Sequence, residues 1–85
     1  MSLVTVYGLE TCVDTVVARR VLDEAQIAYR WVDVAGDERA TEAALALNGG
    51  DARWPIVALG QKVLTEPTET DLRVALRAFE DSPTA

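Results

Sequence analysis

The residue with the clearest capacity for chemistry is Cys12, the only cysteine in a chain of 85 residues that contains no histidine. It lies where a short strand ends and a helix begins, so unpaired backbone N–H groups and the positive end of the helix dipole point toward it. These groups stabilise a thiolate, which is the nucleophilic form of cysteine. The position also fits the other role of a free cysteine, a small apolar side chain packed beneath the loop.

Composition narrows the classes of function. A single cysteine excludes an internal disulfide, and without histidine a zinc site would rest on one thiolate and carboxylates, so we expect no metal. The net charge of −6, with no Lys/Arg cluster, argues against nucleic acid as a partner. No apolar run approaches the roughly 20 residues that span a bilayer, and the N-terminus lacks the features of a signal peptide. We therefore expect a cytoplasmic protein that does not bind membranes.

The first half of the chain predicts a strand, a helix and a second strand. The run 3–7 is β-branched and aromatic, ends at Gly8, and is expected to be buried on both faces. The next segment predicts a helix with one buried apolar stripe, formed by Val13, Val17, Val21 and Ala25 with Val16 and Leu22 alongside. A strand over 28–34 follows, and the short connections imply a right-handed crossover and a parallel pair.

The second half predicts a helix, a hairpin and a last helix. The first of these helices covers 37–47 and ends at Asn48-Gly49-Gly50, which suits a left-handed cap. Pro55 opens a strand over 56–59, and Gly60-Gln61 forms a type II′ turn into a strand over 62–64. Thr68 caps the last helix, with Asp71 three residues on, and its buried stripe is Leu72, Ala75, Leu76 and Phe79.

The order βαβαββα predicts an α/β domain in which helices flank a four-stranded mixed sheet. We expect one domain over residues 1–80 and a flexible tail over 81–85. The charged helix faces are expected to be solvated, namely Arg19-Arg20 with Asp23-Glu24, and Arg73 with Arg77.

An ordered set of segments along nearly the whole chain resembles the glutaredoxin family. These segments are Val4-Thr5-Val6-Tyr7, Cys12, Leu22, Ile27-x-Tyr29, Val32-Asp33-Val34 and Trp54-Pro55. Two further segments are most similar to the actinobacterial mycoredoxin branch, namely Asn48-Gly49-Gly50 and Leu64-Thr65 with Pro67. The resemblance implies a thioredoxin-like fold and a small thiol, mycothiol or glutathione, as co-substrate.

The resemblance also implies a binding site around the cysteine. Pro55 would be a cis-proline that faces Cys12, and the backbone of Trp54 would pair with the bound thiol ligand. The segment Thr65 to Thr68 would receive the carboxylate end of that ligand. Arg53 would then lie near the cysteine, where it could stabilise the thiolate, bind a ligand carboxylate, or simply be a solvated loop residue. The Trp54 indole would be a wall for substrate or would fill the space beneath the loop.

The chain departs from the family at the motif itself. Where the family has Cys-Pro-Tyr-Cys or Cys-Gly-Phe-Ser, this sequence reads Cys12-Val13-Asp14-Thr15. Because Thr15 replaces the second cysteine, a disulfide on Cys12 must be cleared by an external thiol. Thr15 could donate a hydrogen bond to the sulfur or bond the backbone of the first helical turn. Asp14 suits the helix dipole but places a like charge beside a thiolate, and Glu10 adds to that effect.

We expect a monomer, and we consider three functions for this chain. The first is a monothiol thiol–disulfide oxidoreductase that acts through Cys12 on mixed disulfides between proteins and a small thiol. The alternative is a redox-inactive module of the same fold, with a binding or regulatory role, which the acidic motif favours. The third is a cluster-binding dimer, against which Asp14 and the missing Gly-Phe-Ser residues argue.

Overall fold

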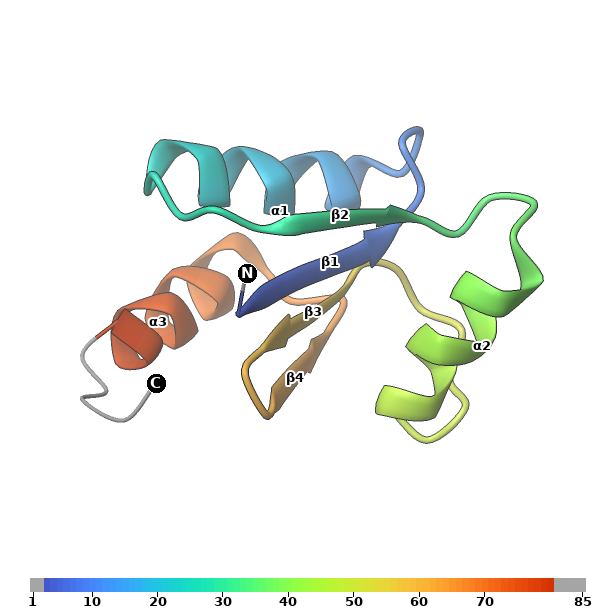
Figure 1. The fold of residues 1–85 in the computed structure, drawn as a ribbon. Helices are drawn as coiled ribbons and strands as arrows, with labels where there is room; N and C mark the ends of the chain where they lie inside the picture. The colour runs from blue at the N-terminus through green and yellow to red at the C-terminus, as the bar shows by residue number, and fades with distance from the viewer. Residues whose placement is uncertain (1–2, 81–85) are drawn as a thin grey trace.

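The computed structural model describes residues 3–80 and has seven elements in the predicted order (Figure 1). The strands are β1 (Val4–Gly8), β2 (Arg30–Asp33), β3 (Ile56–Leu59) and β4 (Lys62–Thr65). The helices are α1 (Val13–Glu24), α2 (Glu38–Leu47) and α3 (Glu69–Glu80). The expected boundaries differ from these mainly at β2, which is shorter than the predicted 28–34. The predicted flexible tail, 81–85, lies outside the described residues.

The sheet order is β2-β1-β3-β4, with β1 parallel to β2 and the other two pairs antiparallel. The parallel pair is the one that the strand–helix–strand connection predicts. β1 is central, and its register places Val6 opposite both Trp31 and Val57. The α/β thioredoxin-like architecture expected from the sequence is therefore the one observed.

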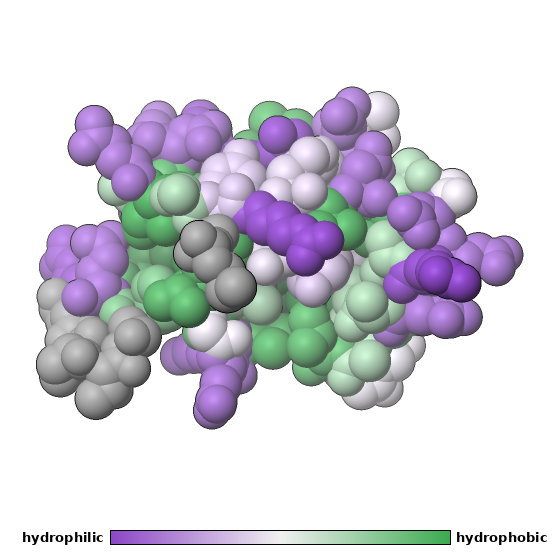
Figure 2. Space-filling model, viewed as in Figure 1, coloured by the Kyte–Doolittle hydropathy of each residue, from purple (hydrophilic) through white to green (hydrophobic). Residues whose placement is uncertain are grey.

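The main core lies on the face of the sheet that α1 and α3 cover. Val4 and Val6 of β1 are almost fully buried there, together with Val57 and Leu59 of β3. The alternate residues of β1, which include Tyr7, are only half-buried, so the expected burial of this strand on both faces is wrong. α2 lies at the opposite face and covers only part of it, and Figure 2 shows apolar residues exposed between β4 and α2.

The phase of α1 also differs from the predicted one. Its buried residues are Thr15, Ala18, Val21 and Leu22. Val13 is 74% exposed and Val16 is 52% exposed, and Ala25 is exposed as well. Small side chains at 15 and 18 face the sheet because the helix packs closely against it, which turns the larger valines of the first turns outward.

The predicted Thr68 cap is confirmed and the backbone of Gly60 fits the predicted hairpin turn, while α2 has an N-terminal cap that was not predicted. Asp37 caps α2 by accepting a hydrogen bond from the Ala40 N–H at 3.0 Å. Thr68 caps α3, where its Oγ1 accepts from the Asp71 N–H at 3.0 Å. Gly60 has a φ of +61° at the hairpin, as the first position of a type II′ turn requires. The predicted buried stripe of α3 is also observed, with Phe79 half-buried beside it.

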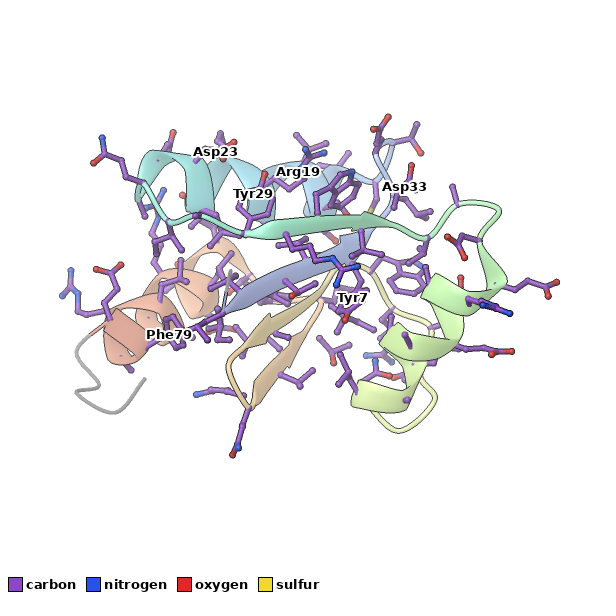
Figure 3. The ribbon with its side chains drawn as sticks, viewed as in Figure 1. Tyr7, Arg19, Asp23, Tyr29, Asp33 and Phe79 are labelled. Carbon is purple, nitrogen blue, oxygen red and sulfur yellow. The ribbon has the colours of Figure 1, made fainter. Side chains whose placement is uncertain are left out.

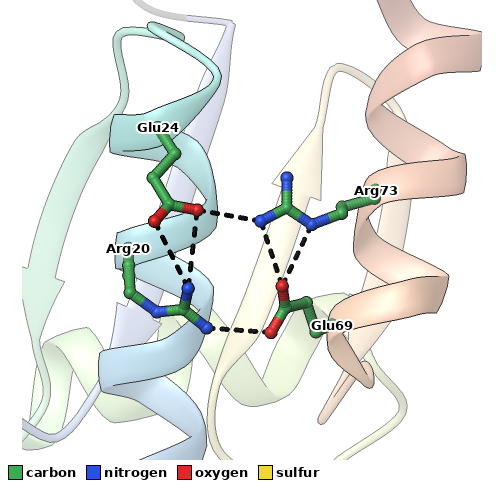
Figure 4. A network of polar contacts seen from close by, with 4 residues as sticks. All are labelled: Arg20, Glu24, Glu69 and Arg73. Atoms are coloured by element: carbon green, nitrogen blue, oxygen red, sulfur yellow. Dashed lines mark hydrogen bonds and ion pairs between the residues drawn. The ribbon is translucent and has the colours of Figure 1, made fainter.

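Four charged residues join α1 to α3 (Figure 4). The Glu69 carboxylate accepts from Arg20 Nη2 at 2.8 Å and pairs with Arg73 Nη2 at 3.0 Å. Glu24 accepts from Arg73 Nη2 at 2.9 Å and pairs with Arg20 Nη1 at 3.3 Å. These side chains are about half-exposed but paired, so the prediction of merely solvated side chains is wrong for Arg20, Glu24 and Arg73. Asp23 and Arg77 are exposed, as predicted.

Arg19 is not free in solvent either. Its guanidinium lies over the Trp31 ring, 4.1 Å from the ring centroid, and its Nε donates to the Tyr29 hydroxyl at 3.1 Å (Figure 3). A cation over an indole face is stabilised by the ring quadrupole. This contact joins the middle of α1 to β2. Among residues 3–80, no helix has the length and apolar character needed to cross a membrane.

Candidate active site

Cys12 is the residue immediately before α1, in extended conformation with φ −79° and ψ 122°. Its N–H donates to the Leu9 carbonyl at 3.0 Å, and its own carbonyl accepts from the Val16 N–H at 3.0 Å. Its side chain makes no capping hydrogen bond, so the N–H groups of the first helical turn keep their capacity to bind an anion. Cys12 is half-buried, so it is not enclosed in the core.

The sulfur faces the segment that leads into β3. Cys12 Sγ lies 3.9 Å from the Trp54 carbonyl oxygen, to which the thiol donates. The Trp54-Pro55 peptide bond is cis, as the resemblance implies, and the Pro55 side chain is fully buried. Trp54 itself is half-buried. The Cys12 sulfur therefore lies next to the backbone of the cis Trp54-Pro55 unit, where the chain enters β3.

The segment after β4 lies directly beside Pro55. The Glu66 N–H donates to the Pro55 carbonyl at 2.8 Å, and Thr65 is the register partner of Ile56. Thr68, which caps α3, follows Glu66 by two residues. The fold thus brings together three of the predicted segments, those around Cys12, Pro55 and Thr65, although they are far apart in the sequence.

Thr15 is fully buried, and its hydroxyl is the one buried side-chain polar atom of residues 3–80 without a hydrogen-bond partner. It packs against Gly8, where an added Cβ would lie 2.6 Å from Oγ1. Neither of the roles predicted for this hydroxyl, a bond to the sulfur or to the backbone, is present in the structure. The hydroxyl nevertheless retains an unused donor one helical turn after Cys12.

Arg53 pairs with a neighbour in its own loop. Its Nε lies 3.3 Å from Asp51 Oδ2, and its side chain is 62% exposed. Asp51 is held in turn by Asn48, which donates to its backbone carbonyl at 2.6 Å. Of the roles weighed for Arg53, the solvated loop residue describes its present position best.

Two features of the site were not expected from the sequence. Glu66 adopts a left-handed backbone conformation with φ +46° beside Pro55. A glutamate in this conformation is uncommon and no sequence signal marks it. The second feature is the apolar surface next to the cysteine, formed by Val13 and Val16, which the periodicity had assigned to the core.

The sequence profile described as Glutaredoxin matches residues 4–64, which is most of the chain and includes Cys12, Trp54 and Pro55. The chain belongs to the glutaredoxin family. No curated protein sequence matches it.

Solved structures share the fold at low identity. A glutaredoxin from Archaeoglobus fulgidus is 22% identical, with a TM-score of 0.80 over 91% of this chain and 88% of that one. A mutant of the thioredoxin-like protein BC3987 is 23% identical, with a TM-score of 0.73 over 86% and 97%. The glutaredoxin-like NrdH-redoxin from Escherichia coli is 20% identical, with a TM-score of 0.71 over 84% and 91%.

Family membership supports a function of the thiol–disulfide oxidoreductase kind, and these structures support the thioredoxin-like fold. Within residues 3–80, no three His, Cys, Asp or Glu side chains are grouped so that they could hold a metal ion. The candidate site brings together one sulfur, one helix terminus and the backbone around a cis-proline.

Proposed function

We propose that this glutaredoxin is a monothiol thiol–disulfide oxidoreductase that removes a small thiol from mixed disulfides on proteins. The observation that carries the proposal is the position of Cys12, which is only half-buried at the start of α1 and has its sulfur 3.9 Å from the Trp54 carbonyl oxygen beside cis-Pro55. A cysteine with a purely structural role would be buried among apolar side chains.

The reaction has two exchange steps. In the first, the Cys12 thiolate attacks the small-thiol sulfur of the mixed disulfide, the old S–S bond breaks, and the protein leaves as a thiolate that takes up a proton from water. In the second, a thiolate of a second small thiol attacks that same sulfur. Cys12 is released and a symmetrical small-thiol disulfide forms. The lone cysteine requires this external thiol.

We assign auxiliary roles to the residues around the sulfur. The unpaired Thr15 hydroxyl donates to the sulfur when the thiol loses its proton and with it the bond to the Trp54 carbonyl. Trp54 and Pro55 position the substrate by their backbone. Thr65 and Thr68 contact the far end of the bound thiol. The support is that Thr65 is the register partner of Ile56 and that Glu66, between the two threonines, donates to the Pro55 carbonyl.

Arg53 assists only if it leaves Asp51. The pair is exposed, and exposed ion pairs are weak, so a bound ligand can displace Asp51 at little cost. The co-substrate we propose is mycothiol or glutathione, and the similarity to the mycoredoxin branch favours mycothiol. The monomeric state, the cytoplasmic location and the thiolated protein partners stay predictions.

The test is intact mass spectrometry after brief exposure of the native protein to the oxidised forms of both small thiols. We expect a single adduct on Cys12, none on Cys12→Ser, and release of the adduct when the reduced small thiol is added. A native protein that forms no adduct, but whose cysteine reacts once it is unfolded, would contradict the proposal. That outcome would support the redox-inactive binding module instead.

A further inference from the structure

The three chain segments that meet at the Cys12 sulfur carry an unusual balance of charge. They are residues 9–15, 51–55 and 64–68, joined by the contact between Cys12 and Trp54 and by the hydrogen bond from Glu66 to Pro55. Together they contain one cation, Arg53, against four carboxylates, on Glu10, Asp14, Asp51 and Glu66.

The single cation is already neutralised. Arg53 Nε lies 3.3 Å from the Asp51 carboxylate, so this pair contributes little net charge. Glu10, Asp14 and Glu66 have no cationic partner among the described residues, and all three are exposed. The surroundings of the sulfur therefore carry three uncompensated negative charges.

These charges act on whatever approaches Cys12. Glu10 and Asp14 are each two residues from Cys12 along the chain, and Glu66 is held to Pro55 by its own N–H. One carboxylate at about 7–10 Å, with an effective dielectric constant of about 40–80, slows an anionic partner by about two- to sevenfold at low salt. Three such groups acting together give a factor of at least about ten.

We propose that this site selects by charge, and that its substrates are disulfides with no carboxylate close to the sulfur that Cys12 attacks. The inference rests on the proposed function and restricts the class of disulfides on which it acts. Glutathione, which carries a carboxylate at each end, is disfavoured. A thiol whose cysteine carboxyl is blocked by an amide, as in mycothiol, meets the condition.

The experiment compares two simple disulfides that differ in charge, bis(2-hydroxyethyl) disulfide and 3,3′-dithiodipropionate. The rate of the Cys12 adduct is followed by intact mass at about 10 mM salt, and the quantity read is the neutral-to-anionic rate ratio. Any change in the fraction of Cys12 thiolate affects both rates equally and cancels in this ratio. The variant is the triple substitution Glu10→Gln, Asp14→Asn and Glu66→Gln.

We expect the triple variant to lower the ratio at least about tenfold, and about 0.5 M salt to lower the wild-type ratio toward the same value. The matched control is Asp23→Asn, which removes one exposed carboxylate at the other end of α1, about 16 Å away by helix rise (Figure 3). It should change the ratio by less than about 1.5-fold.

The outcomes separate the two proposals. Suppose that the adduct forms readily with the neutral disulfide but that the neutral-to-anionic rate ratio of the triple variant stays within about twofold of the wild-type ratio. This result would overturn charge selection and leave the oxidoreductase proposal intact. No adduct with either disulfide would overturn both.

Discussion

At the scale of single residues, the Thr15 hydroxyl is expected to lower the stability of the fold and, under the proposed function, to assist the reaction of Cys12. Its hydroxyl is fully buried without a partner, and a buried hydroxyl that makes no hydrogen bond costs the folded state free energy. The same unpaired donor lies one helical turn after Cys12, where a thiolate would need it. We therefore interpret this hydroxyl as retained for the reaction rather than for the fold.

Thr15→Val separates these two effects, because valine has nearly the shape of threonine without the oxygen. We expect the free energy of unfolding to rise by about 1 kcal/mol, measured by urea denaturation. We expect alkylation of Cys12 by iodoacetamide at fixed pH to slow severalfold. A slower reaction in Thr15→Ser, which keeps the hydroxyl, would point to packing rather than hydrogen bonding as the cause.

At the scale of elements, α1 shows what sequence periodicity can and cannot determine. The presence of this helix and its place after β1 were predicted correctly. Its buried face was not, because valines at 13, 16 and 17 surround the first turns and leave the apolar stripe without a clear direction. The direction is set by tertiary contact, since Gly8 allows only the small Thr15 to face the strand end.

Two substitutions in α1 test this assignment of its faces. Val16→Ser lies on the exposed face and should leave the free energy of unfolding within about 0.5 kcal/mol of wild type. Leu22→Ala removes a fully buried side chain and should lower it by about 2–5 kcal/mol. Urea denaturation measures both. Similar losses in the two variants would mean that the helix is rotated from the described position.

The other elements were more predictable because their signals are local. The cap at Thr68, the turn at Gly60 and the start of β3 at Pro55 each depend on the conformational preference of one or two residues. The site was less predictable for the opposite reason. Whether Arg53 reaches the sulfur or Asp51, and whether Thr15 has a partner, depends on distances between segments that no local pattern contains.

At the scale of the whole molecule, a chain with a single cysteine forms no internal disulfide, so the fold depends on how its layers pack together. The core on the α1 and α3 face supplies most of the burial. The quartet of Arg20, Glu24, Glu69 and Arg73 adds a polar connection over the outside of the same two helices (Figure 4). Glu69 and Glu24 each contact both arginines, and Glu69 is the one whose carboxyl pKa is lowered by these contacts.

Glu69→Gln tests the contribution of this quartet. Hydrogen bonds from Arg73, and then from Arg20, hold the pKa of the Glu69 carboxyl below its ordinary value. A carboxyl with a lowered folded-state pKa contributes stability above its unfolded value, and that contribution is lost as the pH falls through the folded value. We expect wild type to melt a few degrees above the variant near neutral pH.

The difference in Tm between wild type and Glu69→Gln should shrink between about pH 6 and about pH 3, and also in about 0.5 M salt. Differential scanning calorimetry measures it. The matched control is Glu42→Gln, an exposed carboxylate on α2 outside the quartet. A Tm difference that persists unchanged at low pH would show that the side-chain packing of Glu69, and not its charge, is what matters.

The contact between Gly8 and Thr15 has a consequence for which sequences this site can tolerate. With 2.6 Å between a Cβ at position 8 and the hydroxyl oxygen, the two positions share one small volume. A larger residue at the strand end is compatible only with a smaller one on the helix, and a misfit would be relieved by moving the first turn of α1 away from the sheet. Because Cys12 immediately precedes that turn, such a misfit would shift the sulfur relative to Trp54. Positions 8 and 15 are therefore expected to change together, as a pair, in functional variants of this protein.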